Sequence, residues 1–271
     1  MENSSVPLVL FDAYTSGTPL DAPPSALNPA FSLADAYAVE AELVRLKQAR
    51  GARPIGRKVG FANRAMWRIL KLETLVWAHM YDDTVVYARS NAATLSLARR
   101  VAPRIEPEIV LGLRQPLPPG VMAAAEALAS VEWLALGFEI NDCLFPDWKF
   151  KPADFVAAFG FHTALVVGEP RPAESGTLAA LADELSRFTL QLSRDGHLVA
   201  EGAGRNALKS PALCLAELAG AIARQPGADP LAAGELISTG TLTDAQPIAA
   251  GQTWRAHVEG LNLPDLTLAL A

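Results

Sequence analysis

The pattern of apolar and polar positions predicts a helical beginning followed by a body rich in strands. Residues 12–31 are rich in Pro, Ala, Ser and Gly and are expected to form an extended lead-in. A helix is predicted to begin at Ser32, whose hydroxyl suits an N-terminal cap, and to end at Gly51. Asn63 is a second predicted cap, for a short helix over residues 64–70.

Later in the chain, apolar runs alternate with breaks rich in Pro or Gly, which is typical of strands joined by turns. Three further helices are expected in this part, at 121–130, 152–160 and 211–224. The expected strands cover residues 55–61, 104–113, 131–140, 162–168, 187–192, 198–201, 235–238, 253–259 and 265–270. The sequence therefore predicts an α+β fold with an α-rich N-terminal portion over residues 1–80 and a β-rich domain over residues 81–271.

Composition and charge exclude several classes of partner. The chain of 271 residues carries 23 basic and 29 acidic residues, a net charge of −6, and no basic run long enough for a phosphate-binding patch. The N-terminus has no basic segment followed by a long apolar run, and no stretch approaches the roughly 18 apolar residues of a membrane span. The two cysteines, Cys143 and Cys214, do not suggest a disulfide framework. We therefore expect a soluble, cytoplasmic protein that binds neither nucleic acid nor a membrane.

Two carboxylates in an apolar strand are the most informative feature. Glu106 and Glu108 stand two residues apart, so on an extended strand both side chains point to one face. Two buried like charges are costly unless a cation compensates them, and hard divalent cations prefer oxygen ligands. The alternative is an edge strand with two solvated glutamates, and Pro107 between them is compatible with an edge.

Two other residues strengthen the interpretation as a metal site. Glu139 ends a long apolar strand, where a carboxylate is unusual, and is a candidate third ligand. Lys58 lies between Gly56 and Gly60, and it is either a solvated charge or a cation directed at an anionic ligand. Such a set suits the stabilisation of an enolate, because a 2-oxo acid chelates a metal through its carboxylate and keto oxygens while Lys58 adds positive charge.

Other catalytic and cofactor motifs are missing from the sequence. It contains no Gly-x-Ser-x-Gly elbow, no His-Glu-x-x-His helix and no Walker loop. Residues 202–207 have the Gly-x-Gly-x-x-Ala spacing of a dinucleotide loop. They follow a predicted hairpin, however, and Pro211 interrupts the helix that such a loop requires, so we reject this interpretation.

Taken together, the motifs resemble those of the fumarylacetoacetate hydrolase superfamily, and within it the 2-keto-4-pentenoate hydratase and 4-oxalocrotonate decarboxylase group. The resemblance runs from about residue 33 to residue 265, and no single motif is specific alone. The matching segments are Asp35-Ala36-Tyr37-Ala38-Val39, Gly56-Arg57-Lys58-Val59-Gly60, Pro103-Arg104-Ile105-Glu106-Pro107-Glu108-Ile109, Glu139-Ile140-Asn141-Asp142, Asp147-Trp148-Lys149, Gly202-Ala203-Gly204 and Gly240-Thr241-Leu242-Thr243.

The resemblance implies a mixed β-roll core, a homo-oligomeric assembly and a set of functional residues. Glu106, Glu108 and Glu139 would bind Mg²⁺ or Mn²⁺, which makes the β-rich part the metal-binding catalytic domain. Lys58 matches the active-site lysine of the family, with Arg57 beside it in the same motif. Thr241 and Leu242 belong to a loop that borders the substrate, so Arg57, Lys58, Thr241 and Leu242 are the expected substrate contacts.

The sequence also departs from the pattern of this group in the residues that handle protons. Val76 stands where hydratases and decarboxylases of the group usually carry an Asp, and residues 158–162 lack the usual polar side chains. His162 is a candidate base near neutral pH. The alternative is a histidine that is packed and hydrogen-bonded at the start of a strand. With Lys58 and Thr241, His162 completes the predicted catalytic set.

These features predict a metal-dependent lyase that hydrates 2-hydroxypenta-2,4-dienoate or a related 2-oxo acid from the breakdown of aromatic compounds. One alternative is decarboxylation of a 2-oxohexenedioate (4-oxalocrotonate), and another is carbon–carbon hydrolysis of an acylpyruvate. A third is a non-catalytic relative that binds a 2-oxo acid or acts as a scaffold. The expected partners are a small 2-oxo acid, further copies of the chain and, as a variant, a partner decarboxylase or hydratase.

Overall fold

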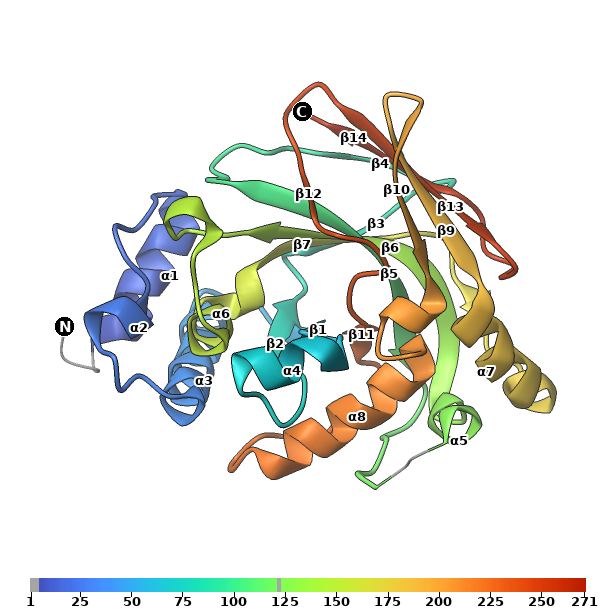
Figure 1. Cartoon of the computed structure of the whole chain (residues 1–271), viewed down its shortest axis with the longest axis horizontal. Coiled ribbons are helices and arrows are strands. Elements are labelled where there is room, and N and C mark those ends of the chain that lie inside the picture. Colours follow the sequence, from blue (N-terminus) through green and yellow to red (C-terminus); the bar gives the residue numbers. More distant parts are fainter. Residues whose placement is uncertain (1–4, 121–122) are drawn as a thin grey trace.

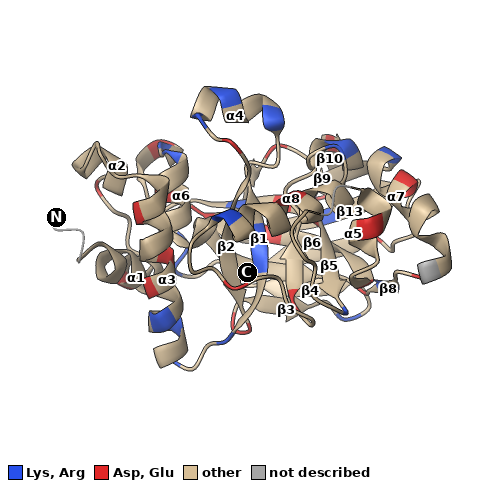
Figure 2. Ribbon diagram, turned by 90° about the horizontal axis from the view of Figure 1, so that it is seen from below, with Lys and Arg blue, Asp and Glu red and all other residues tan. Residues whose placement is uncertain are grey.

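A computed structural model describes residues 5–120 and 123–271 of the chain. Two sheets lie at its centre, and helices α1, α2, α3 and α6 gather at one end, with α7 at the opposite end (Figures 1 and 2). The helices are α1 (Val6–Ser16), α2 (Pro24–Leu27), α3 (Leu33–Ala49), α4 (Arg64–Leu70), α5 (Ala124–Leu128), α6 (Pro152–Ala157), α7 (Leu178–Arg187) and α8 (Pro211–Arg224). The strands are β1 (Pro54–Gly60), β2 (Val76–Tyr81), β3 (Val85–Tyr87), β4 (Ala92–Leu95), β5 (Pro103–Leu113), β6 (Val131–Asp142), β7 (His162–Val167), β8 (Arg171–Pro172), β9 (Thr189–Arg194), β10 (His197–Ala203), β11 (Leu236–Ser238), β12 (Gln246–Pro247), β13 (Thr253–Glu259) and β14 (Leu266–Leu270).

The larger sheet has nine strands and carries the carboxylates identified in the sequence. Its main path runs β2-β1-β11-β5-β6-β7-β3, with β12 added beside β5 and β8 beside β6. The pairs β1/β11 and β3/β7 are parallel and the others antiparallel, so the sheet is mixed. The long strands β5 and β6 pair along most of their length and place Glu106 directly opposite Glu139.

The smaller sheet has five strands in the order β10-β9-β13-β14-β4. Strand β13 alternates strictly, with Trp254, Ala256 and Val258 buried and their neighbours exposed. One face of this sheet therefore packs on the core, as the period of two residues requires. Together the two curled sheets confirm the predicted α+β fold with a mixed β-core.

The N-terminal helices pack on α6 and on the turn that follows it. Phe11, Val39 and Leu43 share an apolar cluster with Phe155 and Phe161. The predicted cap of α3 is confirmed, because the Ser32 hydroxyl accepts the Asp35 N–H while the Asp35 carboxylate accepts the Ser32 N–H. This cluster is distinct from the main core and also contains Val76 of β2 and Cys143 beyond β6, so it joins the N-terminal helices to the larger sheet.

Several predicted elements are confirmed closely and one is wrong. The short helix after Asn63, the helix over 211–224 and the strand over 253–259 have the predicted bounds. The extended lead-in over 12–31 is wrong, because α1 continues to Ser16 and α2 lies within it. Helix α1 has Ser5 at its N-cap position and Pro7 in its first turn, which are local signals of a helix start. They lie before the segment over residues 12–31, whose composition predicts an extended lead-in.

The division of the chain after residue 80 stays a prediction. Strands β1 and β2 precede that boundary, yet both belong to the nine-stranded sheet.

None of the helices in residues 5–120 and 123–271 has the length and apolar character needed to cross a membrane.

Asp154 provides a test of how the N-terminal helices are attached to the body. Its buried carboxylate accepts the Ser25 N–H at 2.7 Å, the Ser25 hydroxyl at 2.7 Å and the Lys151 N–H at 2.8 Å. Asp154→Ala leaves these donors without an acceptor and is expected to lower the free energy of unfolding by about 3 kcal/mol, measured by urea denaturation. Asp183→Ala, which breaks only an exposed pair with Arg187, is the control and should cost less than about 0.5 kcal/mol. Equal losses in the two variants would contradict this role of Asp154.

Candidate active site

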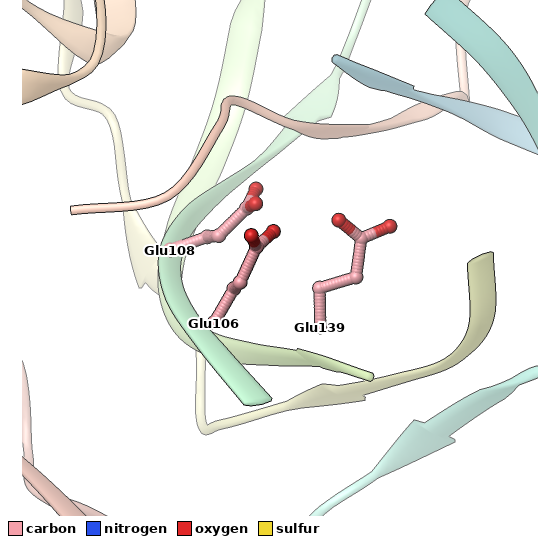
Figure 3. Close-up of side chains that lie close together, drawn as sticks. All are labelled: Glu106, Glu108 and Glu139. Atoms are coloured by element: carbon pink, nitrogen blue, oxygen red, sulfur yellow. The ribbon is translucent and has the colours of Figure 1, made fainter. Parts of the chain in front are cut away.

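Three glutamates from two neighbouring strands converge at one point of the larger sheet. Glu106 and Glu108 project from the same face of β5, and Glu139 projects from β6 beside them (Figure 3). One carboxylate oxygen of each lies within 4.8 Å of the others. Glu108 and Glu139 are fully buried, whereas Glu106 keeps part of its surface open to a cavity. The alternative of an edge strand is wrong, because β5 has β6 on one side and β11 and β12 on the other.

Glu108 is held by the segment that follows β11. One of its oxygens, Oε2, accepts the Ser238 hydroxyl at 2.6 Å and the Gly240 N–H at 2.8 Å. Its other oxygen, Oε1, is buried and has no hydrogen-bond partner among the described residues. A buried carboxylate oxygen without a donor is costly, so this atom calls for a positive ligand.

Glu139 has the opposite environment, with a donor on each oxygen. The Lys58 ammonium group lies 3.1 Å from Oε2, and His162 Nδ1 lies 2.9 Å from Oε1. The other ring nitrogen of His162, Nε2, lies 2.9 Å from the Thr84 hydroxyl. Burial lowers the pKa of His162, which favours the neutral ring, and the Nδ1 proton is then directed at Glu139.

Asn141, two residues beyond Glu139 on β6, links the carboxylates to the lysine. Its side-chain N–H₂ group donates to Glu106 at 2.7 Å, and its side-chain oxygen accepts from Lys58 Nζ at 3.1 Å. Lys58 also donates to the Gly160 carbonyl at 2.9 Å. The amide therefore fixes Glu106 and Lys58 relative to each other.

The three acids differ in how readily they ionise. Burial, reinforced by the neighbouring Glu139, raises the pKa of Glu106 to about 7 against the opposing effect of Lys58. Burial and the two other carboxylates raise the pKa of Glu108 well above its usual value. For Glu139, burial also favours the neutral acid, but Lys58 and His162 outweigh it and lower the pKa.

This arrangement fits a divalent metal ion. The donor set consists of carboxylate oxygens, which Mg²⁺ and Mn²⁺ prefer, and one of these oxygens is buried without a partner. A bound dication would also offset the repulsion that raises the pKa values of Glu106 and Glu108. Glu106, Glu108 and Glu139 are therefore the residues that would hold the ion, and Lys58 and Asn141 flank them.

The carboxylates border a cavity of about 560 Å³, which we call the carboxylate cavity. Glu106, Lys58 and Asn141 lie on its wall, and residues 240–244 form another side. Glu201 and Asn206 also line the cavity, and five of its lining residues are aromatic: Phe61, Trp148, Phe150, Phe155 and Phe161. Of the described residues that line this cavity, Lys58 is the only cationic one.

A left-handed turn supports Lys58 from the side of α6. Phe159, Gly160 and Phe161 all have positive φ, at 56°, 57° and 57°. A Cβ at Gly160 would lie 2.8 Å from Cδ of Lys58, so only glycine allows the lysine side chain to pass this close. Two phenylalanines in this conformation are strained, which is common where the backbone positions a functional group.

The structure brings some predicted site residues to the carboxylate cavity and not others. Thr241 and Leu242 line it, although the Thr241 hydroxyl donates to the Thr243 carbonyl and the Leu242 side chain is buried in the core. Arg57 is not brought there, because it alternates with Lys58 along β1 and pairs with Glu235 at 2.8 Å. His162 lies behind Glu139 and is only 1% exposed, so it corresponds to the alternative of a packed, hydrogen-bonded histidine.

Four features of the candidate active site were not predicted from the sequence. Asn141 shares a strand face with Glu139, and this spacing of two residues is a signal that identifies it. Ser238, the Gly160 carbonyl and the aromatic lining come from segments far apart in the chain, so no local pattern indicates them. Val76 is buried and does not line the cavity.

Comparison with known proteins agrees with this geometry. The family model described as fumarylacetoacetate (FAA) hydrolase C-terminal matches residues 70–264, which is most of the chain. The chain belongs to this family. Among its relatives, a 2-hydroxyhexa-2,4-dienoate hydratase of Comamonas testosteroni is 30% identical over 254 residues, covering 93% of this chain and 92% of that protein. A 4-oxalocrotonate decarboxylase of a Pseudomonas species is 32% identical over 232 residues, covering 86% of this chain and 85% of that protein.

Solved structures show the same fold. The 4-oxalocrotonate decarboxylase of Pseudomonas putida G7, complexed with magnesium and adipate, superposes with a TM-score of 0.88 at 24% identity and covers 100% of this chain and 97% of its own. The fumarylpyruvate hydrolase of Pseudomonas aeruginosa, in complex with Mn²⁺ and pyruvate, has a TM-score of 0.60 at 17% identity and covers 80% of this chain and 89% of its own. At these identities the likeness shows a common fold, and it confirms the fumarylacetoacetate hydrolase type of core.

Metal binding at the three glutamates is expected to depend on pH. A metal needs ionised carboxylates, and Glu106, with a pKa raised to about 7, is mostly protonated at pH 6 and mostly ionised at pH 8. The apparent affinity for Mn²⁺ should therefore rise at least about tenfold from pH 6 to pH 8, with proton release at pH 6. Calorimetric titration in buffers of different ionisation enthalpy measures both quantities.

Two variants, one on β5 and one on β6, test whether Glu106 is a ligand. Glu106→Gln should weaken Mn²⁺ binding and reduce proton release, whereas Glu132→Gln, an exposed residue on β6, should change neither. Equal affinities for wild type and Glu106→Gln would contradict the assignment of Glu106 as a ligand.

Proposed function

We propose that the protein is a metal-dependent hydro-lyase that adds water to 2-hydroxypenta-2,4-dienoate or a close 2-oxo acid relative. The reaction converts the dienol to its 2-oxo-3-enoate form, and water then adds its oxygen to C4 and a proton to C3. The 2-hydroxyhexa-2,4-dienoate hydratase among the relatives supports this reaction class. One observation carries the choice within the class: a cavity with a single cation and an aromatic wall beside three clustered carboxylates.

The wall of the carboxylate cavity suits a substrate with one anionic end and an apolar tail. Lys58 and the carboxylate cluster lie together, so the charged 2-oxo acid end belongs there. The aromatic side chains of Phe150, Phe155 and Phe161 offer apolar contact to the rest of a short conjugated chain. A dicarboxylate would place its second charge against this wall, where no described lining residue supplies a cation.

The ion at Glu106, Glu108 and Glu139 would supply Lewis acidity toward the substrate's carboxylate and 2-oxygen. Lys58 places an ammonium group beside the same position, where negative charge grows as the enolate forms. Asn141 and the Gly160 carbonyl hold that ammonium group, and the aromatic wall limits the access of bulk water. His162 acts as a positioning residue, because it touches Glu139 and not the cavity.

Decarboxylation of 4-oxalocrotonate is the second candidate. The 32% identical relative of that name supports it. The carboxylate cavity disfavours it, since the second carboxylate of a hexenedioate has no cationic partner among the described lining residues. Hydrolysis of an acylpyruvate needs the same enolate, and a non-catalytic relative would bind ligand without turnover, so both are outcomes of the test below.

Assembly and location extend this proposal. We propose that the chain forms a homo-oligomer in the cytoplasm, alone or with a partner decarboxylase or hydratase. Thr241 and Leu242 would contact the substrate from the loop after β11, Thr241 through its hydroxyl and Leu242 through its backbone.

Turnover by the purified protein tests the proposed reaction. With Mg²⁺ present, 2-hydroxypenta-2,4-dienoate should lose its ultraviolet absorbance and yield 4-hydroxy-2-oxopentanoate, identified by mass spectrometry. Lys58→Met should lower kcat at least about 100-fold, because it removes a charge that acts on the transition state. Glu132→Gln is the control and should keep wild-type turnover. Release of CO₂ from 4-oxalocrotonate with no hydration of the dienoate would establish the decarboxylase instead.

Phe150 provides a test of the charge preference, because it is half-buried on the wall of the carboxylate cavity. Phe150→Arg places a second cation there and should improve kcat/KM for a dicarboxylate relative to a monocarboxylate by about tenfold, or 1.4 kcal/mol. Phe150→Leu preserves the apolar wall and should leave that ratio unchanged. A wild-type protein that already prefers dicarboxylates would refute the argument from the wall.

A further inference from the structure

A second cavity, of about 470 Å³, lies between the end of α3, the end of α1 and the loop before β5. We call it the arginine cavity. Four basic residues line it, Lys47, Arg50, Arg99 and Arg100, together with two acidic residues, Asp82 and Asp83. It shares no lining residue with the carboxylate cavity. In an acidic protein this local excess of positive charge is unusual.

The two acidic residues do not neutralise the arginines. Asp82 binds Arg53, whose Nε lies 2.9 Å from the carboxylate, and Asp83 binds Lys47 at 2.6 Å. None of the carboxylates in residues 5–120 and 123–271 lies within ion-pair distance of Arg50, Arg99 or Arg100. Arg50 stacks on the Phe11 ring at 4.4 Å, which leaves its N–H groups free for an acceptor. Three guanidinium groups therefore surround one space without a counter-charge.

Arg100 adds a second, independent observation. Its terminal Nη2 donates to the Thr163 carbonyl at 3.1 Å, which fixes the guanidinium group. Its Nε–H is buried and has no acceptor within the described part of the chain. A buried donor in this state is costly, and an anion bound beside the rest of the Arg100 guanidinium group would offset that cost through its charge.

The loop that carries Arg99 and Arg100 is anchored by Asp142, the last residue of β6. Both oxygens of the buried Asp142 carboxylate accept backbone N–H groups just beyond it, from Val101 at 2.8 Å and Ala102 at 2.6 Å. Arg99 adopts a left-handed conformation with φ 65°, and its backbone lies against Gly17 so closely that a Cβ there would clash at 2.1 Å. Arg99 and Arg100 are thus presented by an anchored loop, and Arg50 by the end of helix α3, which lowers the cost of ordering these residues on binding.

From these observations we propose that the arginine cavity binds a small anion that carries carboxylate or phosphate oxygens. Guanidinium groups match both kinds of oxyanion through paired N–H donors. The hydroxyl of Tyr14 on the same wall offers a further donor. The size of the cavity fits an inorganic phosphate or a short dicarboxylate, and the site is independent of the proposed hydratase reaction.

The test measures anion binding to the metal-free protein. Without metal, the carboxylate cavity lacks the ion that would bind an anionic group, and its wall carries Glu106, Glu201 and Asp244 against Lys58 alone. Anion binding to the metal-free protein then reports the arginine cavity. Inorganic phosphate and succinate are titrated separately by calorimetry at constant ionic strength with chloride as the background. We expect one saturable site with a Kd below about 1 mM for at least one of them. The tighter of the two identifies the oxyanion class.

Matched variants locate the site. Arg100→Gln and Arg50→Gln should each weaken binding at least tenfold, whereas Arg45→Gln, an exposed residue of the same helix α3 outside the cavity, should not. Circular dichroism and the melting temperature without anion check that each variant is folded. Arg50 is exposed, so Arg50→Gln still tests the site if Arg100→Gln does not fold. The proposal is overturned if neither anion binds at about 10 mM, if Arg45→Gln has the same effect, or if Lys58→Met abolishes binding.

Discussion

Repulsion among three carboxylates governs the organisation of this protein. The register of β5 and β6 sets Glu106 directly opposite Glu139, and the strand period places Glu108 on the same face. Like charges in such pairs destabilise a sheet, and burial strengthens the effect because little water screens them. The larger sheet therefore contains an electrostatic repulsion that positive charge nearby offsets.

The three carboxylates differ in the partners that stabilise their negative charge. Lys58, His162 and Asn141 serve Glu139 and Glu106, while Glu108 receives two neutral donors and keeps one oxygen unpartnered. Glu139 thus ionises most readily, whereas the pKa values of Glu106 and Glu108 are raised, an effect that a bound cation would offset. The strained turn around Gly160 and the aromatic side chains beside it belong to the same arrangement, because they fix Lys58 from the side away from the carboxylates. The N-terminal helices in turn pack on that turn, which connects the distant end of the molecule to the position of one ammonium group.

Local signals in the sequence were sufficient for much of the fold and for the core of the site. Caps at Ser32 and Asn63, alternation along β13 and the spacing of Glu106 and Glu108 all act within a few residues, so they can be recognised without a structure. Helix α1 was missed because its start signals, Ser5 and Pro7, lie before residues 12–31, where the Pro- and Gly-rich composition predicts an extended chain. Helix α7 was missed as well, and its N-cap residue Thr177 makes no side-chain capping bond. The orientation of Arg57 and the place of His162 behind Glu139 depend on which strands are neighbours, and no local pattern contains that information. The same limit applies to Ser238, which reaches Glu108 only because β11 lies beside β5.

Pro107 has a consequence for how such a fold can diversify. The Pro107 carbonyl accepts the Leu242 N–H, so this edge of β5 faces the loop that follows β11. Between β11 and β12 none of the described strands pairs with this edge, and a proline, which has no N–H, is tolerated there. The loop over residues 239–245 fills this interruption, and both of its ends are anchored to the strand that carries Glu106 and Glu108. A change of sequence at residues 241–244 would therefore alter the wall of the carboxylate cavity, whereas a change at Gly240, whose N–H binds Glu108, would also reach the carboxylates. The fold that this chain shares with a decarboxylase and a hydrolase can in this way present a different cavity wall through one short segment.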